Sequence, residues 1–156
     1  MQPDDLAALE RLCEWSAWTP FSEAVNTAPR EPGVYMAREG RSGPIVYVGM
    51  AGERRGQGIR GRLSVYASGK ALASGLGEAV ADRAFSDAAW LQLRLDEVTR
   101  GEPRRALEWG RAAFQRADLY VRWTVTADRQ AARVLERKCG VACPDLWNRL
   151  AFTRTK

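Results

Sequence analysis

The sequence contains no histidine among its 156 residues, and that absence removes several classes of site. A Ser-His-Asp triad, a nuclease that uses histidine as its base and a zinc site with imidazole ligands all require this residue. Any general base must therefore be a carboxylate, a lysine, a tyrosine, a thiolate or a metal-bound hydroxide.

Cysteine and long apolar runs are also scarce. The three cysteines are an odd number, and Cys139 and Cys143 enclose three residues where a zinc knuckle usually has two, so we interpret them and Cys13 as reduced core thiols. No apolar run approaches the roughly 18 residues that span a bilayer. The N-terminus carries Asp4 and Asp5 where a secretory signal would be basic. The sequence therefore predicts a cytoplasmic protein without a membrane partner.

The residue type in excess is arginine. The chain has 24 Lys and Arg against 19 Asp and Glu, for a net charge of +5. The charge is −4 over residues 1–37, +5 over 38–70, zero over 71–117 and +4 over 118–156. If the two basic stretches meet in space, they form one cationic surface, and the planar fork of arginine matches phosphate oxygens. The alternative is an ordinary solvated surface, and charge alone does not decide between them.

Length and 46% hydrophobic content fit a single domain over residues 1–156. Alternating and β-branched residues predict three strands, at 33–37, 45–49 and 119–125, of which the first two form an antiparallel hairpin. Helical spacing predicts helices within 4–15, from about 59 to 67, over 78–99 and 103–116, and from a cap at Asp128 to Cys139, with Gly140 ending the last. We therefore predict an α+β fold, a small three-stranded antiparallel sheet flanked by helices.

The hairpin carries two tyrosines on one face. Side chains alternate along a strand, so Tyr35 and Tyr47 share a side with Gly33 and Gly49, where a missing side chain would let a ligand backbone approach. The opposite face is expected to pack on helices and comprises Val34, Met36, Val46 and Val48.

These residues resemble a known family. Pro32-Gly33-Val34-Tyr35, followed after a short turn by Val46-Tyr47-Val48-Gly49 and then by Arg62 on a helix, is similar to the signature of the GIY-YIG nuclease superfamily, with valine in place of isoleucine. Tyr66 stands four residues after Arg62, as the family's partner residue does, and Glu136 matches the single glutamate of the helix after the third strand.

The resemblance covers about residues 29–149, with a helical leader over 1–28 and an extra helical insert over 70–117. It implies a GIY-YIG-like sheet and a metal-dependent endonuclease that hydrolyses phosphodiester bonds in nucleic acid, DNA more than RNA, with one metal ion. The catalytic positions that it implies are Tyr35, Tyr47, Arg62, Tyr66, Glu136 and, near the end of the chain, Asn148.

The implied roles agree with the chemistry of the residue types. Glu136 would hold one hydrated Mg²⁺ or Mn²⁺, because these hard cations keep several waters and take few carboxylates. Arg62 would bind the scissile phosphate, and Tyr35 would orient or deprotonate the attacking water, with Tyr47 and Tyr66 completing the hydrogen-bond network. A phenol is a poor base at neutral pH unless nearby cations favour phenolate.

Further phosphate contacts are expected from Arg54, Arg55 and Arg60 beside Arg62, with Gly49 admitting the ligand. Cutting both strands with one site usually requires two copies or two binding events, so a homodimer is one of the open arrangements.

Three alternatives stand beside the nuclease interpretation. Glu136-Arg137-Lys138 is also a Glu-x-Lys triplet, which another class of restriction enzyme places on a strand. The chain could be a nucleic-acid-binding module that keeps this scaffold without cutting. It could also be a protein-interaction domain that uses Trp90 and Trp109 of the insert, although large aromatic residues belong more often to a core.

Overall fold

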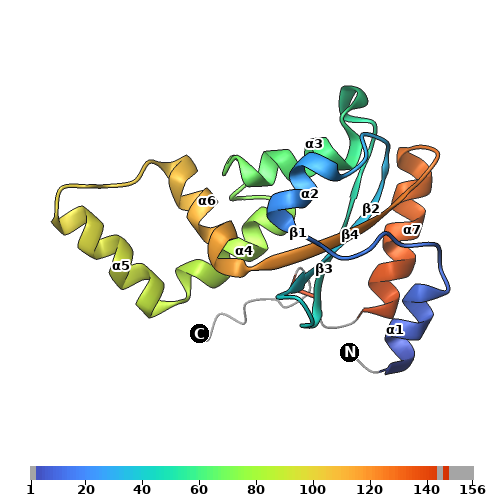
Figure 1. The fold of residues 1–156 in the computed structure, drawn as a ribbon, viewed down its shortest axis with the longest axis horizontal. Coiled ribbons are helices and arrows are strands. Elements are labelled where there is room, and N and C mark those ends of the chain that lie inside the picture. The colour runs from blue at the N-terminus through green and yellow to red at the C-terminus, as the bar shows by residue number, and fades with distance from the viewer. Residues whose placement is uncertain (1–2, 144–145, 148–156) are drawn as a thin grey trace, which may run out of the picture.

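The structure is a computed structural model of the chain, and it describes residues 3–143, 146 and 147. Asn148, a predicted site residue, lies outside the described residues. The helices are α1 (Pro3–Glu10), α2 (Phe21–Thr27), the short 3-10 helix η1 (Arg54–Gly56), α3 (Gly58–Ala67), α4 (Gly75–Phe85), α5 (Ala88–Thr99), α6 (Ala106–Ala117) and α7 (Arg129–Ala142). The strands are β1 (Thr19–Pro20), β2 (Gly33–Glu39), β3 (Ile45–Ala51) and β4 (Leu119–Val125). The α+β class is confirmed (Figure 1).

The sheet has four strands, in the order β1-β4-β2-β3, and each neighbouring pair is antiparallel. The prediction of three strands was therefore wrong by one. β1 is only two residues long, and its Thr19 and Pro20 pair with Val121 and Tyr120. A strand this short has no alternation to detect, and proline is typical of an edge position.

A bulge in β3 changes which side chains share a face. Ala37 pairs with Tyr47 but Arg38 pairs with Ile45, so Val46 is an extra residue without a partner opposite it. Val46 consequently packs on the same side as Tyr47, and Ile45 packs with Val48. The predicted apolar face of the hairpin was thus correct for three of its four residues and wrong for Val46.

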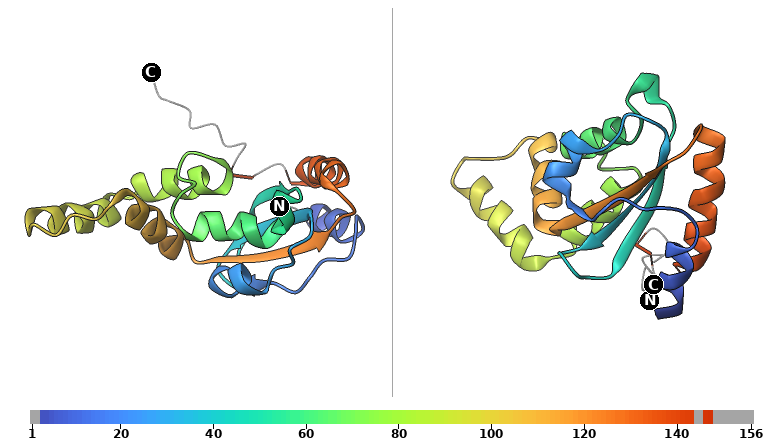
Figure 2. Two further views of the ribbon diagram at one scale, coloured as in Figure 1. Left: turned by 90° about the horizontal axis from the view of Figure 1, so that it is seen from above. Right: turned by 45° about the vertical axis from the view of Figure 1, so that its right-hand side comes forward.

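Helices cover both faces of the sheet. The face that carries Tyr35 and Tyr47 packs against α2, α3, α4 and α6, and the opposite face packs against α1 and α7 (Figures 1 and 2). Both sets form apolar clusters in which β2 residues alternate between the two sides, as a strand with two buried faces must.

The leader is fastened to the sheet by arginines stacked between aromatic rings. Arg122 is 5% exposed, and its Nη1 donates to Glu10 Oε1 at 2.6 Å. Its guanidinium lies 5.1 Å from the ring centre of Trp15 and 4.8 Å from that of Trp18, while Arg38 lies 4.3 Å from Trp18. These contacts with ring faces and with a carboxylate compensate the cost of burying the two charged guanidinium groups.

The insert consists of three helices rather than the two predicted. The expected helix over 78–99 breaks at Ser86, because Asp87 accepts hydrogen bonds from the Ala89 and Trp90 N–H groups at 3.0 and 3.1 Å and so begins a new helix. The third helix begins at Ala106 and not at Pro103. In Figure 1, α5 lies farthest from the sheet, beyond α6.

The tryptophans of the insert pack together as expected for a core. Trp90 is 8% exposed, and its ring meets that of the partly buried Trp109 edge to face at 5.5 Å. This packing weakens the idea that the two tryptophans are a free binding surface.

α7 begins as predicted, because the Asp128 side chain accepts the Ala131 N–H at 2.8 Å. It does not end at Gly140, which is buried inside the helix, but continues to Ala142. Cys139 is buried, and burial raises the pKa of its thiol to about 12. Among the described residues, no helix combines the length and the apolar content that crossing a membrane requires.

Candidate active site

Three of the predicted tyrosines form a buried cluster. Tyr35 on β2, Tyr47 on β3 and Tyr66 on α3 are 1%, 6% and 0% exposed. The hydroxyls of Tyr35 and Tyr66 are hydrogen-bonded at 3.1 Å, and burial together with the nearby Tyr66 raises the pKa of Tyr47. The rings of Tyr35 and Tyr47 stack with their centres 6.1 Å apart. The sheet and α3 therefore hold three phenol groups in one network.

The glycines of the two motifs are required by the protein's own packing. A Cβ on Gly49 would lie 2.6 Å from the Tyr35 hydroxyl and 2.7 Å from the Tyr47 ring, and a Cβ on Gly33 would lie 2.1 Å from the Thr124 carbonyl oxygen. The expectation that these glycines leave space for a ligand is therefore wrong at the side-chain positions. Gly49 makes room for the tyrosine network, and Gly33 makes room for β4.

Arg62 extends from α3 over the tyrosine cluster. Its guanidinium carbon lies 4.7 Å from the ring centre of Tyr66. Burial acts to lower the pKa of Arg62, but its interactions with Tyr35 and Tyr66 outweigh burial, so the group stays charged. Its Nε is buried and has no hydrogen-bond partner among the described residues.

The start of α4 also belongs to this cluster, which the sequence did not suggest. The Leu76 N–H donates to the Tyr66 hydroxyl at 3.3 Å. Gly75 has φ +55, and a Cβ there would lie 2.6 Å from the Tyr66 hydroxyl and 2.9 Å from the Tyr47 hydroxyl. Ser74-Gly75 is a weak helix-start signal by itself, and nothing local connects it with a tyrosine ten residues earlier. The insert thus takes part in the site.

Glu136 approaches the cluster from the other side of the sheet. It lies on α7, and the Met50 N–H of β3, the end strand, is close enough to lower the pKa of its carboxyl. Arg62 is also close enough to lower the pKa of Glu136, and Glu136 is close enough to raise that of Tyr47. The edge of β3 therefore brings together a cation from one face and a carboxylate from the other.

Burial sets the charge states of these groups. Burial raises the pKa of Glu136, although Arg133, Arg137 and Arg62 act against it. Burial also raises the pKa of Tyr35 well above its ordinary value, with Tyr66 and Tyr47 adding to the effect and Arg62 opposing it. Tyr35 is therefore a neutral phenol at neutral pH, which can orient a partner by hydrogen bonding but is a poor base.

The three arginines predicted to contact phosphate differ in their surroundings. Arg54 and Arg55 are exposed, with φ angles of 45° and 55°, a backbone conformation that is unfavourable for side chains and that clusters at functional sites. Arg60 is partly buried, and its Nε donates to the Ala28 carbonyl at 2.7 Å, which ties α3 to the end of α2. Arg60 thus has a structural contact that the other two lack.

The candidate site offers a metal ion one carboxylate, that of Glu136. Within the described residues there is no group of three or more His, Cys, Asp or Glu side chains that could hold a metal. The half-buried Glu136 carboxylate fits a hydrated ion such as Mg²⁺, which is bound through one or two carboxylates and keeps several waters. It does not fit zinc, which takes four protein ligands in structural sites and three in catalytic ones.

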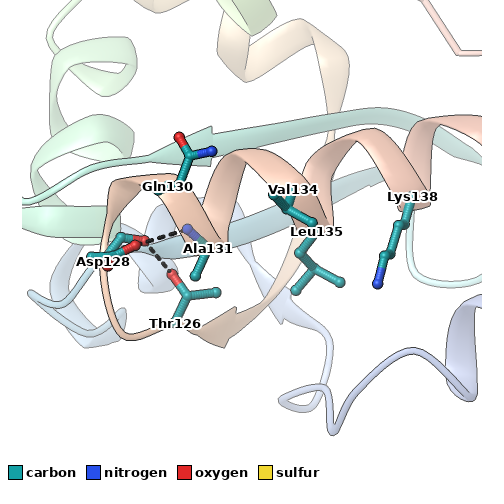
Figure 3. A pocket seen from close by; sticks show the side chains of 7 residues that line it. All are labelled: Thr126, Asp128, Gln130, Ala131, Val134, Leu135 and Lys138. Carbon is teal, nitrogen blue, oxygen red and sulfur yellow. Dashed lines mark hydrogen bonds between the residues drawn. The ribbon is translucent and has the colours of Figure 1, made fainter.

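A surface depression of about 490 Å³ lies elsewhere, along α7 (Figure 3). Thr126, Val134 and Lys138 are among the residues that line it, and Figure 3 shows Thr126 and Asp128 at its end by the start of the helix. None of the predicted site residues lines it, so the concave surface and the polar cluster are separate features.

Comparison of the chain with models of protein families, with curated proteins and with solved structures finds no match.

Proposed function

We propose that this chain is a metal-dependent endonuclease that hydrolyses phosphodiester bonds in nucleic acid, DNA more than RNA, as its resemblance to the GIY-YIG superfamily implies. The supporting observation is that Arg62, which lies on the Tyr66 ring beside the buried tyrosine cluster, is close enough to Glu136 to lower the pKa of its carboxyl against the effect of burial. A phosphodiester site needs a cation for the non-bridging oxygens and a means of activating water, and these residue types supply both.

Arg62 binds the scissile phosphate in this proposal. Arg62 is only partly buried, so part of its side chain remains accessible to an incoming phosphate. The Tyr66 ring, whose centre lies 4.7 Å from the guanidinium carbon, holds this guanidinium in place. Holding the cation in place before the substrate arrives lowers the cost of reorganisation in the transition state.

In this proposal Glu136 would hold the Mg²⁺ or Mn²⁺ ion, which would supply a water of lowered pKa and positive charge to stabilise the leaving group. Ionised Glu136 is required for this, and the three arginines around it favour that form against burial. Tyr35 orients the attacking water rather than deprotonating it, because its hydroxyl is buried and neutral.

The burial of Tyr35 also favours the second candidate, a nucleic-acid-binding module that does not cut. Burial raises the pKa of Tyr35 and of Tyr47, so neither is poised to act as a base, and activation of the water would fall to the metal that Glu136 would hold. The Glu-x-Lys alternative is not retained, because Glu136, Arg137 and Lys138 lie in the middle of α7 and not on a strand.

The deciding experiment is cleavage of supercoiled plasmid, single-stranded DNA and RNA with Mg²⁺ or Mn²⁺. Wild type should cut, and Glu136→Gln, which keeps an acceptor for the Met50 N–H, should lose about 100-fold or more in rate. Glu78→Gln, an exposed glutamate of α4, is the matched control and should cut like wild type. If wild type binds nucleic acid as tightly as Glu136→Gln and neither cuts, the chain is a binding module.

A further inference from the structure

Three exposed arginines stand on one side of α7 at four-residue intervals: Arg129, Arg133 and Arg137. Residues four apart are neighbours on a helix surface, and each step advances about 6 Å along its axis. We refer to these three residues as the arginine ridge.

The ridge adjoins the candidate active site. Glu136 lies three residues after Arg133 and directly before Arg137 on the same helix, and both arginines lower the pKa of its carboxyl against the effect of burial. A chain of phosphates that enters the site past Glu136 would therefore pass the ridge.

The ridge also connects to the other basic stretch of the sequence. The side chain of Arg129 packs on Gly52, where a Cβ would lie 3.1 Å from its Cγ and Cδ atoms, and the Glu53 carboxylate accepts the Arg129 N–H at 3.0 Å. Arg54 and Arg55 follow directly in η1. Gly52 and Glu53 are more than seventy residues from Arg129 in sequence, and their contacts with it bring the two basic stretches together at the start of α7.

The charges of the ridge are not neutralised as those of other arginines are. In the insert, Arg94 and Arg104 pair with Glu97 at 3.0 and 2.8 Å, and Arg116 pairs with Asp87 at 2.7 Å. No ion pair within 4.0 Å involves a ridge arginine in the part of the chain that the structure describes. The insert therefore balances its own charge, whereas the ridge leaves positive charge exposed to solvent.

We infer that the arginine ridge binds the phosphates of one nucleic-acid strand that runs along α7 on its way to or from the site. This inference rests on the proposed function and assigns residues beyond those that the motifs indicate. The ridge spans about 12 Å, which is the axial length of three to four nucleotides of a strand that rises about 3.4 Å each. Each guanidinium can bind a phosphate through two parallel hydrogen bonds.

The test measures binding without catalysis, in EDTA, for labelled double-stranded DNA, single-stranded DNA and RNA over a series of salt concentrations. The variant is Arg133→Gln with Arg137→Gln, two exposed positions where glutamine preserves helix formation. If each arginine neutralises one phosphate, the slope of log K against log salt should fall in magnitude by about 1.8 for duplex DNA.

Lys138→Gln is the matched control. This variant removes one positive charge from the same helix. Lys138 is not part of the ridge, because it lines the depression of Figure 3 on another side of α7. It should leave the salt slope at the wild-type value. Equal decreases in the slope for Lys138→Gln and for the double variant would show a general charge effect and would overturn the inference.

The outcomes separate the ridge from the proposed function. If wild type binds with a steep salt slope and the double variant keeps that slope, the ridge inference fails while nucleic-acid binding stands. If wild type binds none of the three probes, both the proposed function and the ridge fail. Circular dichroism of the double variant should match wild type, so that a change in slope reports on contacts and not on folding.

Discussion

Removing the Tyr66 hydroxyl should destabilise the protein by an amount that its contacts define. In Tyr66→Phe the ring keeps its stacking on Phe114, 5.7 Å between centres, and its place beneath Arg62. The hydroxyl loses its bond to Tyr35, and the buried Leu76 N–H loses its acceptor. At about 1 kcal/mol for each hydrogen bond lost, the free energy of unfolding should fall by about 2 kcal/mol.

The measurement is urea unfolding followed by tryptophan fluorescence, since the chain has six tryptophans. A loss of about 2 kcal/mol corresponds to a melting temperature lower by roughly 4–8 °C in a domain of this size. The control is Tyr120→Phe, because the partly exposed Tyr120 hydroxyl makes no hydrogen bond to the described residues. It should stay within about 0.5 kcal/mol of wild type. Equal midpoints for the two variants would refute the claim that the tyrosine network is a cooperative, buried unit.

Two further results are expected. Gly33→Ala should lower the free energy of unfolding by about 3 kcal/mol or more, because its Cβ would lie 2.1 Å from the Thr124 carbonyl oxygen of the neighbouring strand. A urea midpoint equal to that of wild type would contradict the packing of β2 against β4. Burial raises the pKa of Glu136 above 4.5, so the folded chain keeps this proton at pH values where the unfolded chain has released it, and stability relative to Glu136→Gln should decline as pH rises through that interval. If the difference in unfolding free energy between the two proteins stays constant from about pH 4 to about pH 8, the claim that burial raises the pKa of Glu136 is wrong.

The hairpin could be predicted because its information is local. Strand alternation and the glycine-rich turn between residues 38 and 44 set the positions of Tyr35 and Tyr47, and both lie on one face as the alternation requires. The four-residue interval between Arg62 and Tyr66 similarly placed them together on α3.

Other features depend on contacts between distant parts of the chain. The bulge at Val46 results from how β3 pairs with β2, and no residue type marks it. Gly75 and Leu76 join the site because the start of α4 lies against the Tyr66 hydroxyl, so their importance is visible only in the folded chain. The sequence predicts that Gly49 leaves space for a ligand, because its sequence neighbours do not show that the Tyr35 hydroxyl fills that space.

Glu136 shows how a tertiary contact alters the meaning of a local pattern. On an isolated helix, a glutamate between Arg133 and Arg137 forms surface ion pairs that contribute little. Here α7 places that glutamate near the edge of β3, where the Met50 N–H and the charge of Arg62 both lower the pKa of its carboxyl against the effect of burial. The tyrosines that make the motif recognisable are almost wholly buried, whereas Arg62 and Glu136 are only half-buried. In the proposed function, the buried tyrosines would support the site, and a substrate would first contact the two charged groups, Arg62 and Glu136.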